Sequence, residues 1–366
     1  MRASVDLWKW FYAYEKQARA KNDSQGLQLV RAFNEGFSYR STDPERSLHI
    51  YTQGVDLARK MGEACWELFL SYWVCDLYLF NLKNYDLGLG KAIQNFTLAH
   101  QPAYQNCAII ARVYLSVLNA YFRIDARGYI TEIRQIMKYM SENVRLDQDT
   151  FLVLQHYTVS IHILYEEWDE AEQAALKYLD TAKGAREREV DAYYMLNVVA
   201  ANKKQIEKAY AYAIEQEKSA RALKRFDIVA TALIKQAAYH LKIGKKTEAE
   251  NLYQQARTII DGFKSGRATG YYGYYALYQI GLGNLEAALD LHDKQLAEEL
   301  SSRNYVDEID IRIARLRLMG KLGRSLKDDL AIVYTLTKKL RAPEYYMEKL
   351  QKIERGDYAD PYDYFE

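Results

Sequence analysis

The stretch KKQIEKAYAYAI, residues 203–214, has a pattern that recurs along this chain. A polar turn is followed by an aliphatic or aromatic residue, then by charged residues, and then by a small residue that opens a helical pattern. The recurrence predicts one structural unit repeated along the chain. The other matches are LKNYDLGLGKAI (82–93), YEEWDEAEQAAL (165–176), KIGKKTEAENLY (242–253) and GLGNLEAALDLH (281–292).

The small residues of these stretches are spaced almost regularly. They are Gly88, Ala171, Ala209, Ala249 and Ala287, and the last four are about 40 residues apart. Weaker matches extend the series, with Leu48 and Ile130 in register and a last match in LGRSLKDDLAIVYTL (322–336). A unit of this length with two helical patterns is typical of stacked helical hairpins. The sequence therefore predicts an all-α fold, a right-handed superhelical solenoid of about eight antiparallel helix pairs.

The composition agrees with a helical chain. Its 366 residues include only four prolines, so little interrupts a helical hydrogen-bond ladder. The net charge is +1, which argues against a dominant nucleic-acid surface, because such a surface needs excess Lys and Arg. No stretch has the length and apolar character of a signal peptide or a membrane span.

The three cysteines, Cys65, Cys75 and Cys107, are an odd number without the spacing of a disulfide framework. This pattern favours reduced, mostly buried thiols and, with the absence of a leader, a cytoplasmic location.

The sequence offers little catalytic chemistry. The six histidines are scattered without metal-ligand spacing. Gly281 and Gly283 are expected to form a turn; a dinucleotide fingerprint would need a third glycine where Glu286 stands. The acidic run 166–170 could be a carboxylate or metal site, but an interhelix turn with acids at a helix N-terminus explains it better. We therefore expect no enzyme activity, metal or cofactor.

Four segments are expected along the chain. Residues 1–27 would form a capping helix, residues 28–340 the repeat array, residues 341–356 a second capping helix, and residues 357–366 a flexible acidic aromatic tail. Within the array, VDEIDIRIARLRLMGK (306–321) alternates apolar and charged residues like a strand. A helix with Ile309, Ile313 and Leu316 facing inward fits its neighbours better.

The repeat resembles the tetratricopeptide family. In one unit the family's positions fall on Tyr193, Leu196 and Asn197 in the first helix and on Ala209 and Ala213 in the second. The family's terminal proline is missing, and its glycine is usually replaced. The longer period resembles the elongated units of bacterial signalling regulators and adaptors. The resemblance covers roughly residues 28–340 and implies a groove lined by the first helix of each unit.

This groove is the expected place of function. The primary hypothesis is a non-catalytic scaffold or adaptor that binds a protein or peptide there; the alternative is a ligand- or peptide-sensing signalling regulator whose superhelix changes shape on binding. Tyrosines suit such a surface, although Tyr271, Tyr274 and Tyr278 fall on the stripe expected to pack between helices. The candidate peptide-binding residues are His156, Asp191, Tyr194, Tyr272 and Gln279, with Ser160, Val198, Ile234, Ala238 and Ala276 on the same wall.

Overall fold

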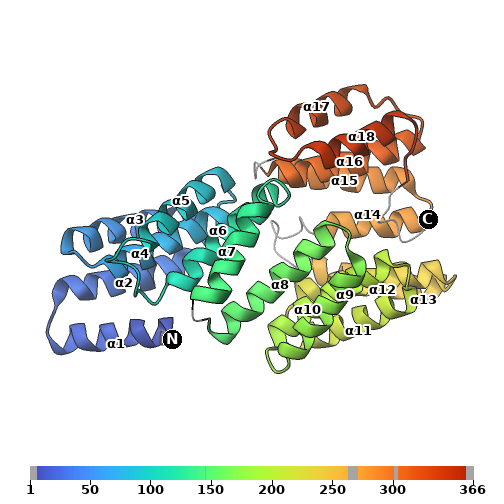
Figure 1. Ribbon diagram of the computed structural model, residues 1–366. Helices are drawn as coiled ribbons and strands as arrows, with labels where there is room; N and C mark the ends of the chain where they lie inside the picture. The colour runs from blue at the N-terminus through green and yellow to red at the C-terminus, as the bar shows by residue number, and fades with distance from the viewer. Residues whose placement is uncertain (1–5, 145, 263–270, 301–303, 360–366) are drawn as a thin grey trace. The chain divides into compact units, whose positions relative to one another are not determined.

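The computed structural model consists of α-helices joined by short turns (Figure 1). It describes residues 6–144, 146–262, 271–300 and 304–359, and within these ranges it contains eighteen α-helices and no strand. Two compact units are distinguished: Met1–Phe151 with Ser302–Val306, and Leu152–Ser301 with Asp307–Glu366. The predicted all-α class is confirmed.

The helices of the first unit are α1 (Leu7–Ala20), α2 (Ser24–Tyr39), α3 (Pro44–Met61), α4 (Ala64–Asp76), the π-helical turn η1 (Leu77–Asn81), α5 (Tyr85–Ala99), α6 (Ile110–Asp125) and α7 (Ile130–Asn143). Helix α8 (Gln148–Leu164) contains the boundary between the units. Those of the second unit are α9 (Trp168–Thr181), α10 (Arg186–Asn202), α11 (Ile206–Ala222), α12 (Phe226–Lys242), α13 (Lys246–Asp261), α14 (Tyr271–Gly281), α15 (Leu285–Glu299), α16 (Tyr305–Lys321), α17 (Lys327–Thr337) and α18 (Glu344–Glu354).

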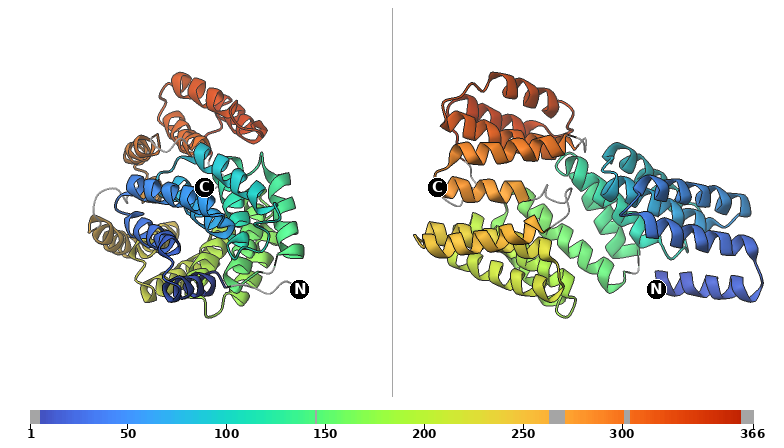
Figure 2. Two further views of the ribbon diagram at one scale, coloured as in Figure 1. Left: turned by 90° about the vertical axis from the view of Figure 1, so that its left-hand side faces the viewer. Right: turned by 180° about the vertical axis from the view of Figure 1, so that it is seen from behind.

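From α2 to α17 the helices follow one another as eight pairs, each joined by a short turn; the hairpins are visible from two further sides in Figure 2. Helix α1 precedes the first pair and α18 follows the last. This matches the predicted helical-hairpin repeat. The assignment of α1 and α18 as caps stays a prediction, as does the flexible tail, of which residues 360–366 lie outside the described residues.

The small residue that marks the repeat is the fourth residue of the second helix in a pair. Gly88, Ala171, Ala209 and Ala249 all occupy this position and are buried, as the spacing predicts. Three predicted register positions are wrong. The buried fourth residue is Ser47 rather than Leu48, Ile133 rather than Ile130, and Ala288 rather than the exposed Ala287. In each case the helix begins at a residue that the sequence pattern did not fix.

The buried position brings the two helices of a hairpin close enough for side chains to bond across them. Asn197 of α10, where the tetratricopeptide pattern has glycine, donates from Nδ2 to the Ala209 carbonyl at 2.7 Å and to the Tyr239 hydroxyl at 3.0 Å. In the first hairpin, the Ser47 hydroxyl donates to the Gly36 carbonyl at 2.7 Å. In both hairpins a polar side chain of one helix therefore donates a hydrogen bond to the backbone of the other helix.

Six of the eight turns inside the hairpins contain a residue in the left-handed region. Gly283 has φ +78°, as predicted for a turn between α14 and α15, and the amide of Asn284 donates to the Gln279 carbonyl at 2.9 Å to close the helix end. The corresponding turns place Lys83, Glu166, Lys204, Gly244 and Gly323 at positive φ. Because non-glycine residues fill this position in three hairpins, glycine is an incomplete guide to the turn.

Two glycines on α5 allow a matched test of the close helix approach. A Cβ at Gly88 would overlap the buried Leu79 side chain, whereas a Cβ at the exposed Gly90 has nothing within 4 Å. We expect Gly88→Ala to lower the free energy of unfolding by about 1–3 kcal/mol through overpacking. Gly90→Ala should raise it by about 0.5–1 kcal/mol through helix propensity. Urea denaturation of both variants checks this, and equal effects would contradict the packing.

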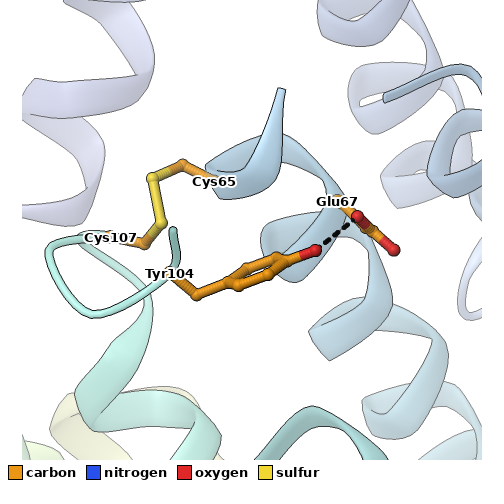
Figure 3. Close-up of a disulfide and its surroundings, with 4 residues drawn as sticks. All are labelled: Cys65, Glu67, Tyr104 and Cys107. Atoms are coloured by element: carbon orange, nitrogen blue, oxygen red, sulfur yellow. Dashed lines mark hydrogen bonds between the residues drawn. A yellow bond between two sulfur atoms is a disulfide. The ribbon is translucent and has the colours of Figure 1, made fainter. Parts of the chain in front are cut away.

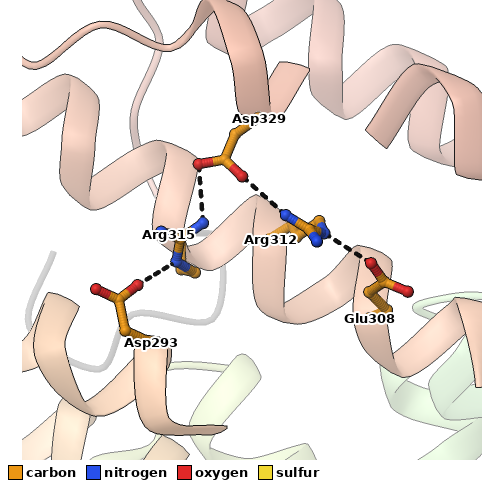
Figure 4. A network of polar contacts seen from close by, with 5 residues as sticks. All are labelled: Asp293, Glu308, Arg312, Arg315 and Asp329. Carbon is orange, nitrogen blue, oxygen red and sulfur yellow. Dashed lines mark hydrogen bonds and ion pairs between the residues drawn. The ribbon is translucent and has the colours of Figure 1, made fainter. Parts of the chain in front are cut away.

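The segment 306–321 is helical, as predicted, and Ile309, Ile313 and Leu316 of α16 are all buried. Its alternating pattern also reflects a polar network on α16, which is drawn in Figure 4. Asp329 of α17 accepts from Arg312 at 2.9 Å and from Arg315 at 2.8 Å. These arginines also pair with Glu308 and with Asp293 of α15. The network thus joins α15, α16 and α17. The charged residues of α16 that take part in it are among those that give the sequence its strand-like alternation.

The prediction of three reduced cysteines is wrong. Cys65, near the start of α4, forms a disulfide with Cys107, which precedes α6; only Cys75 is a free thiol, and it is buried (Figure 3). Beside the disulfide, the Tyr104 hydroxyl donates to the Glu67 carboxylate at 2.8 Å. The sequence did not predict this disulfide because the two cysteines are 42 residues apart and come together only through packing of the segment after α5.

Candidate functional site

In the second compact unit, side chains from the first helices of three hairpins lie close together. Tyr194 of α10 has an exposed fraction of 41%, which is high for a ring on a packed helix. The Nζ of Lys235 on α12 lies 4.2 Å from the centroid of this ring and 5.6 Å from the ring centroid of Tyr274 on α14. We call Tyr194, Lys235 and Tyr274 the Tyr194 face.

Lys235 is buried, with an exposed fraction of 3%. Among the described residues its Nζ has no hydrogen-bond partner. Burial disfavours the charged amine and lowers the pKa of Lys235 to about 7. It is unusual for a buried amine to contact two aromatic rings and to have no hydrogen-bond acceptor among the described residues, because buried lysines are normally paired with an opposite charge.

The sequence analysis missed Lys235. Helix α12 (FDIVATALIKQAAYHLK) is apolar on most sides, and Lys235 follows Leu233 and Ile234, which are buried. A lysine in such a run is a signal that could have been used, since a helix apolar on all sides is buried all round. The pattern of inward positions selected the neighbouring Ile234 instead.

Asp191, a predicted site residue, lies one turn before Tyr194 on α10. Its carboxylate forms an ion pair with Arg188 at 3.5 Å. Burial raises the pKa of Asp191, and the charges of Arg188 and Arg225 oppose that rise. Asp191 is therefore near the Tyr194 face but already has cationic partners.

His156, the predicted site residue on α8, belongs to the packing of its own hairpin. Its ring lies edge-on to Tyr178 of α9, with centroids 6.2 Å apart, and its Nδ1 is buried without a hydrogen-bond partner among the described residues. Burial, reinforced by the charge of Arg188, lowers the pKa of His156 to about 4, so the ring is neutral near pH 7. The neutral ring suits a packing role.

The two predicted site residues of α14, Tyr272 and Gln279, form hydrogen bonds with residues outside the Tyr194 face. Tyr272 forms a side-chain hydrogen bond with Glu298 of α15, and burial raises the pKa of Tyr272. Gln279 accepts a hydrogen bond from Asn284 at 3.0 Å in the turn that follows α14. Neither of these contacts involves Lys235, and the binding role predicted for Tyr272 and Gln279 stays a prediction.

The tyrosines assigned to packing divide into two groups. Tyr271 and Tyr278 are buried, and Tyr278 stacks on Tyr253 with ring centroids 4.1 Å apart. Its hydroxyl also donates to Glu250 at 2.9 Å. Tyr274 is only half-buried and contacts both the core and the neighbourhood of Lys235.

The described residues contain no cluster of three or more His, Cys, Asp or Glu side chains placed to hold a metal ion. Over the same residues, none of the helices combines the length and apolar character needed to cross a bilayer. Comparison with protein-family models finds no match to this chain, and comparison with curated proteins finds none either.

Proposed function

We propose that this chain is a non-catalytic binding module, a tetratricopeptide-like scaffold or adaptor that binds a protein or peptide segment on the Tyr194 face. The observation that supports this most is the exposed ring of Tyr194 on a first helix, next to the buried amine of Lys235. Tyrosine offers a large contact area with few rotatable bonds, which is why it is enriched in interface hot spots.

The arrangement of the hairpins supports binding rather than catalysis. Nearly all described helices belong to the repeated pairs, and the binding wall that we propose is formed by the first helices of the second unit. Proteins built in this way commonly bind partners along such a wall.

A cytoplasmic location is not part of the proposal. It was predicted from reduced thiols, and the Cys65–Cys107 disulfide removes that support, because structural disulfides persist mainly in oxidising compartments. Alkylation of free thiols in intact cells before lysis measures the redox state in place.

A matched pair of tyrosine variants tests the proposed function. Partners are captured on the immobilised chain and quantified by mass spectrometry, and the captured partner is then titrated against purified variants. We expect Tyr194→Ala to weaken the binding about 30-fold, as hot-spot tyrosines do. Tyr139→Ala is the control, because Tyr139 of α7 has the same exposed fraction of 41%. Retention of every partner by Tyr194→Ala would contradict the proposal.

A further inference from the structure

Among the described residues, burial shifts the pKa of Asp76, Asp191 and Lys235 on first helices, and Lys235 alone of these three has no opposing charge. Burial raises the pKa of Asp76 on α4 to about 6, and the charges of Arg40 and Arg112 oppose the rise. Asp191 on α10 is opposed in the same way by Arg188 and Arg225. For Lys235 burial is the sole cause of the shift. The amine therefore has no opposite charge to balance it.

The surroundings of Lys235 explain why no internal group fills this role. Its Nζ lies 4.2 Å from the ring centroid of Tyr194 on α10 and 5.6 Å from that of Tyr274 on α14. The next residue on α12, Gln236, donates to Glu217 of α11 at 2.7 Å, and Glu217 also accepts from Arg221. Glu217 of α11 is therefore already engaged by two donors.

An unpaired buried amine is costly for the folded protein, and a ligand can remove that cost. A carboxylate brought to Nζ would restore the charged state and form a charge-assisted hydrogen bond in a site with little water. The aromatic rings on either side would contact the residues that flank the acidic one. Lys235 then acts as a specificity residue rather than as part of the core.

We propose that the Tyr194 face binds a peptide segment through an aspartate or glutamate side chain whose carboxylate pairs with the Nζ of Lys235. This inference rests on the proposed function and names the chemistry of its partner. A single amine matches the single negative charge of a carboxylate, whereas a phosphate with nearly two charges would be only partly neutralised.

Access to the amine requires one side chain to move. The Nζ of Lys235 lies 4.2 Å from the centroid of the Tyr194 ring, which is 41% exposed, and exposed side chains change rotamer within nanoseconds. The four-carbon stem of Lys235 can also extend toward the surface, as lysine stems do at interfaces.

The probe for this inference is a random peptide library displayed on phage, selected in parallel on four forms of the full chain. These are the natural chain, Lys235→Met, Tyr194→Ala and Lys242→Met, the last being a control on the same helix. We expect the natural chain and Lys242→Met to enrich peptides with a shared acidic position, and Lys235→Met not to enrich them. In a selected peptide, changing that Asp to Asn or Glu to Gln should weaken binding about 30-fold on the natural chain and have little effect on Lys235→Met.

Each result decides between the two proposals. Selected peptides that have no acidic position, or that bind Lys235→Met equally well, would overturn the carboxylate inference. The proposed function would survive if those peptides still lost affinity for Tyr194→Ala. Failure to select any peptide that depends on Tyr194 would overturn both. Circular dichroism and thermal melting of each variant establish that it is folded before its binding is compared.

Discussion

Replacing Lys235 by Met is expected to make the protein more stable, raising the free energy of unfolding by about 2–4 kcal/mol near neutral pH and below. Methionine has a similar length and fills the same buried volume without an amine. The natural residue is buried with two tyrosine rings for neighbours and, among the described residues, no acceptor for its Nζ. Most core substitutions destabilise, so an increase is a distinctive result.

The effect should depend on pH in a direction fixed by the two pKa values. Burial lowers the pKa of Lys235 in the folded chain from 10.5 to about 7. Between these values the unfolded chain binds more protons than the folded chain, so the stability of the natural protein rises with pH across this window. The destabilisation is fully present below about pH 7 and is lost as the pH approaches 10.5.

Urea denaturation at several pH values across this window measures the effect. The difference between Lys235→Met and the natural chain should be largest at the acidic end and shrink toward the alkaline end. Lys242→Met on the same helix should show no such dependence. A destabilised Lys235→Met variant, or a difference that does not change with pH, would contradict an unpaired buried amine.

Removing the Cys65–Cys107 disulfide is expected to have an effect of similar size and opposite sign. The bond closes a loop with a sequence separation of 42, for which the loss of chain entropy in the unfolded state corresponds to about 4 kcal/mol. The double variant Cys65→Ser, Cys107→Ser should therefore melt well below the natural protein, and reduction of the natural protein should have the same effect.

Thiol counting provides the control for this prediction. The unreduced chain should react with a thiol reagent only at Cys75, and only after denaturation, because Cys75 is buried. Reduction before denaturation should expose all three cysteines. Three reactive thiols in the unreduced denatured chain would show that the bond is absent, and unchanged stability of the double variant would show that it does not constrain the chain.

The repeated pairs could be predicted from the sequence because local chemistry determines them. A polar turn, charged residues in the first helical turn and a small residue such as Ala209 or Ala249 recur at each hairpin. The pattern could not fix the exact helix start. In GLGNLEAALDLH, Ala287 and Ala288 are adjacent small residues, and only the observed start of α15 at Leu285 places Ala288 in the buried position.

The candidate site could be predicted only in part, because it depends on contacts between hairpins. Tyr194 was correctly placed on a first helix, but Lys235 and Tyr274 meet it through the packing of α10, α12 and α14, which no local pattern encodes. The disulfide is similar, since Cys65 and Cys107 are joined by tertiary packing. Residue spacing therefore predicts the individual helices well, but it predicts contacts between helices that are distant in the sequence poorly.

The proposed carboxylate site depends most on the protonation state of the Lys235 amine, which nuclear magnetic resonance can measure directly. In protein labelled with ¹³C at lysine side chains, the signal that is missing from Lys235→Met identifies the residue and can be followed during a pH titration. We expect this amine to titrate near pH 7 in the free chain and at a higher pH when a selected acidic peptide is bound. Titration of the free chain near the ordinary value of 10.5 would contradict it.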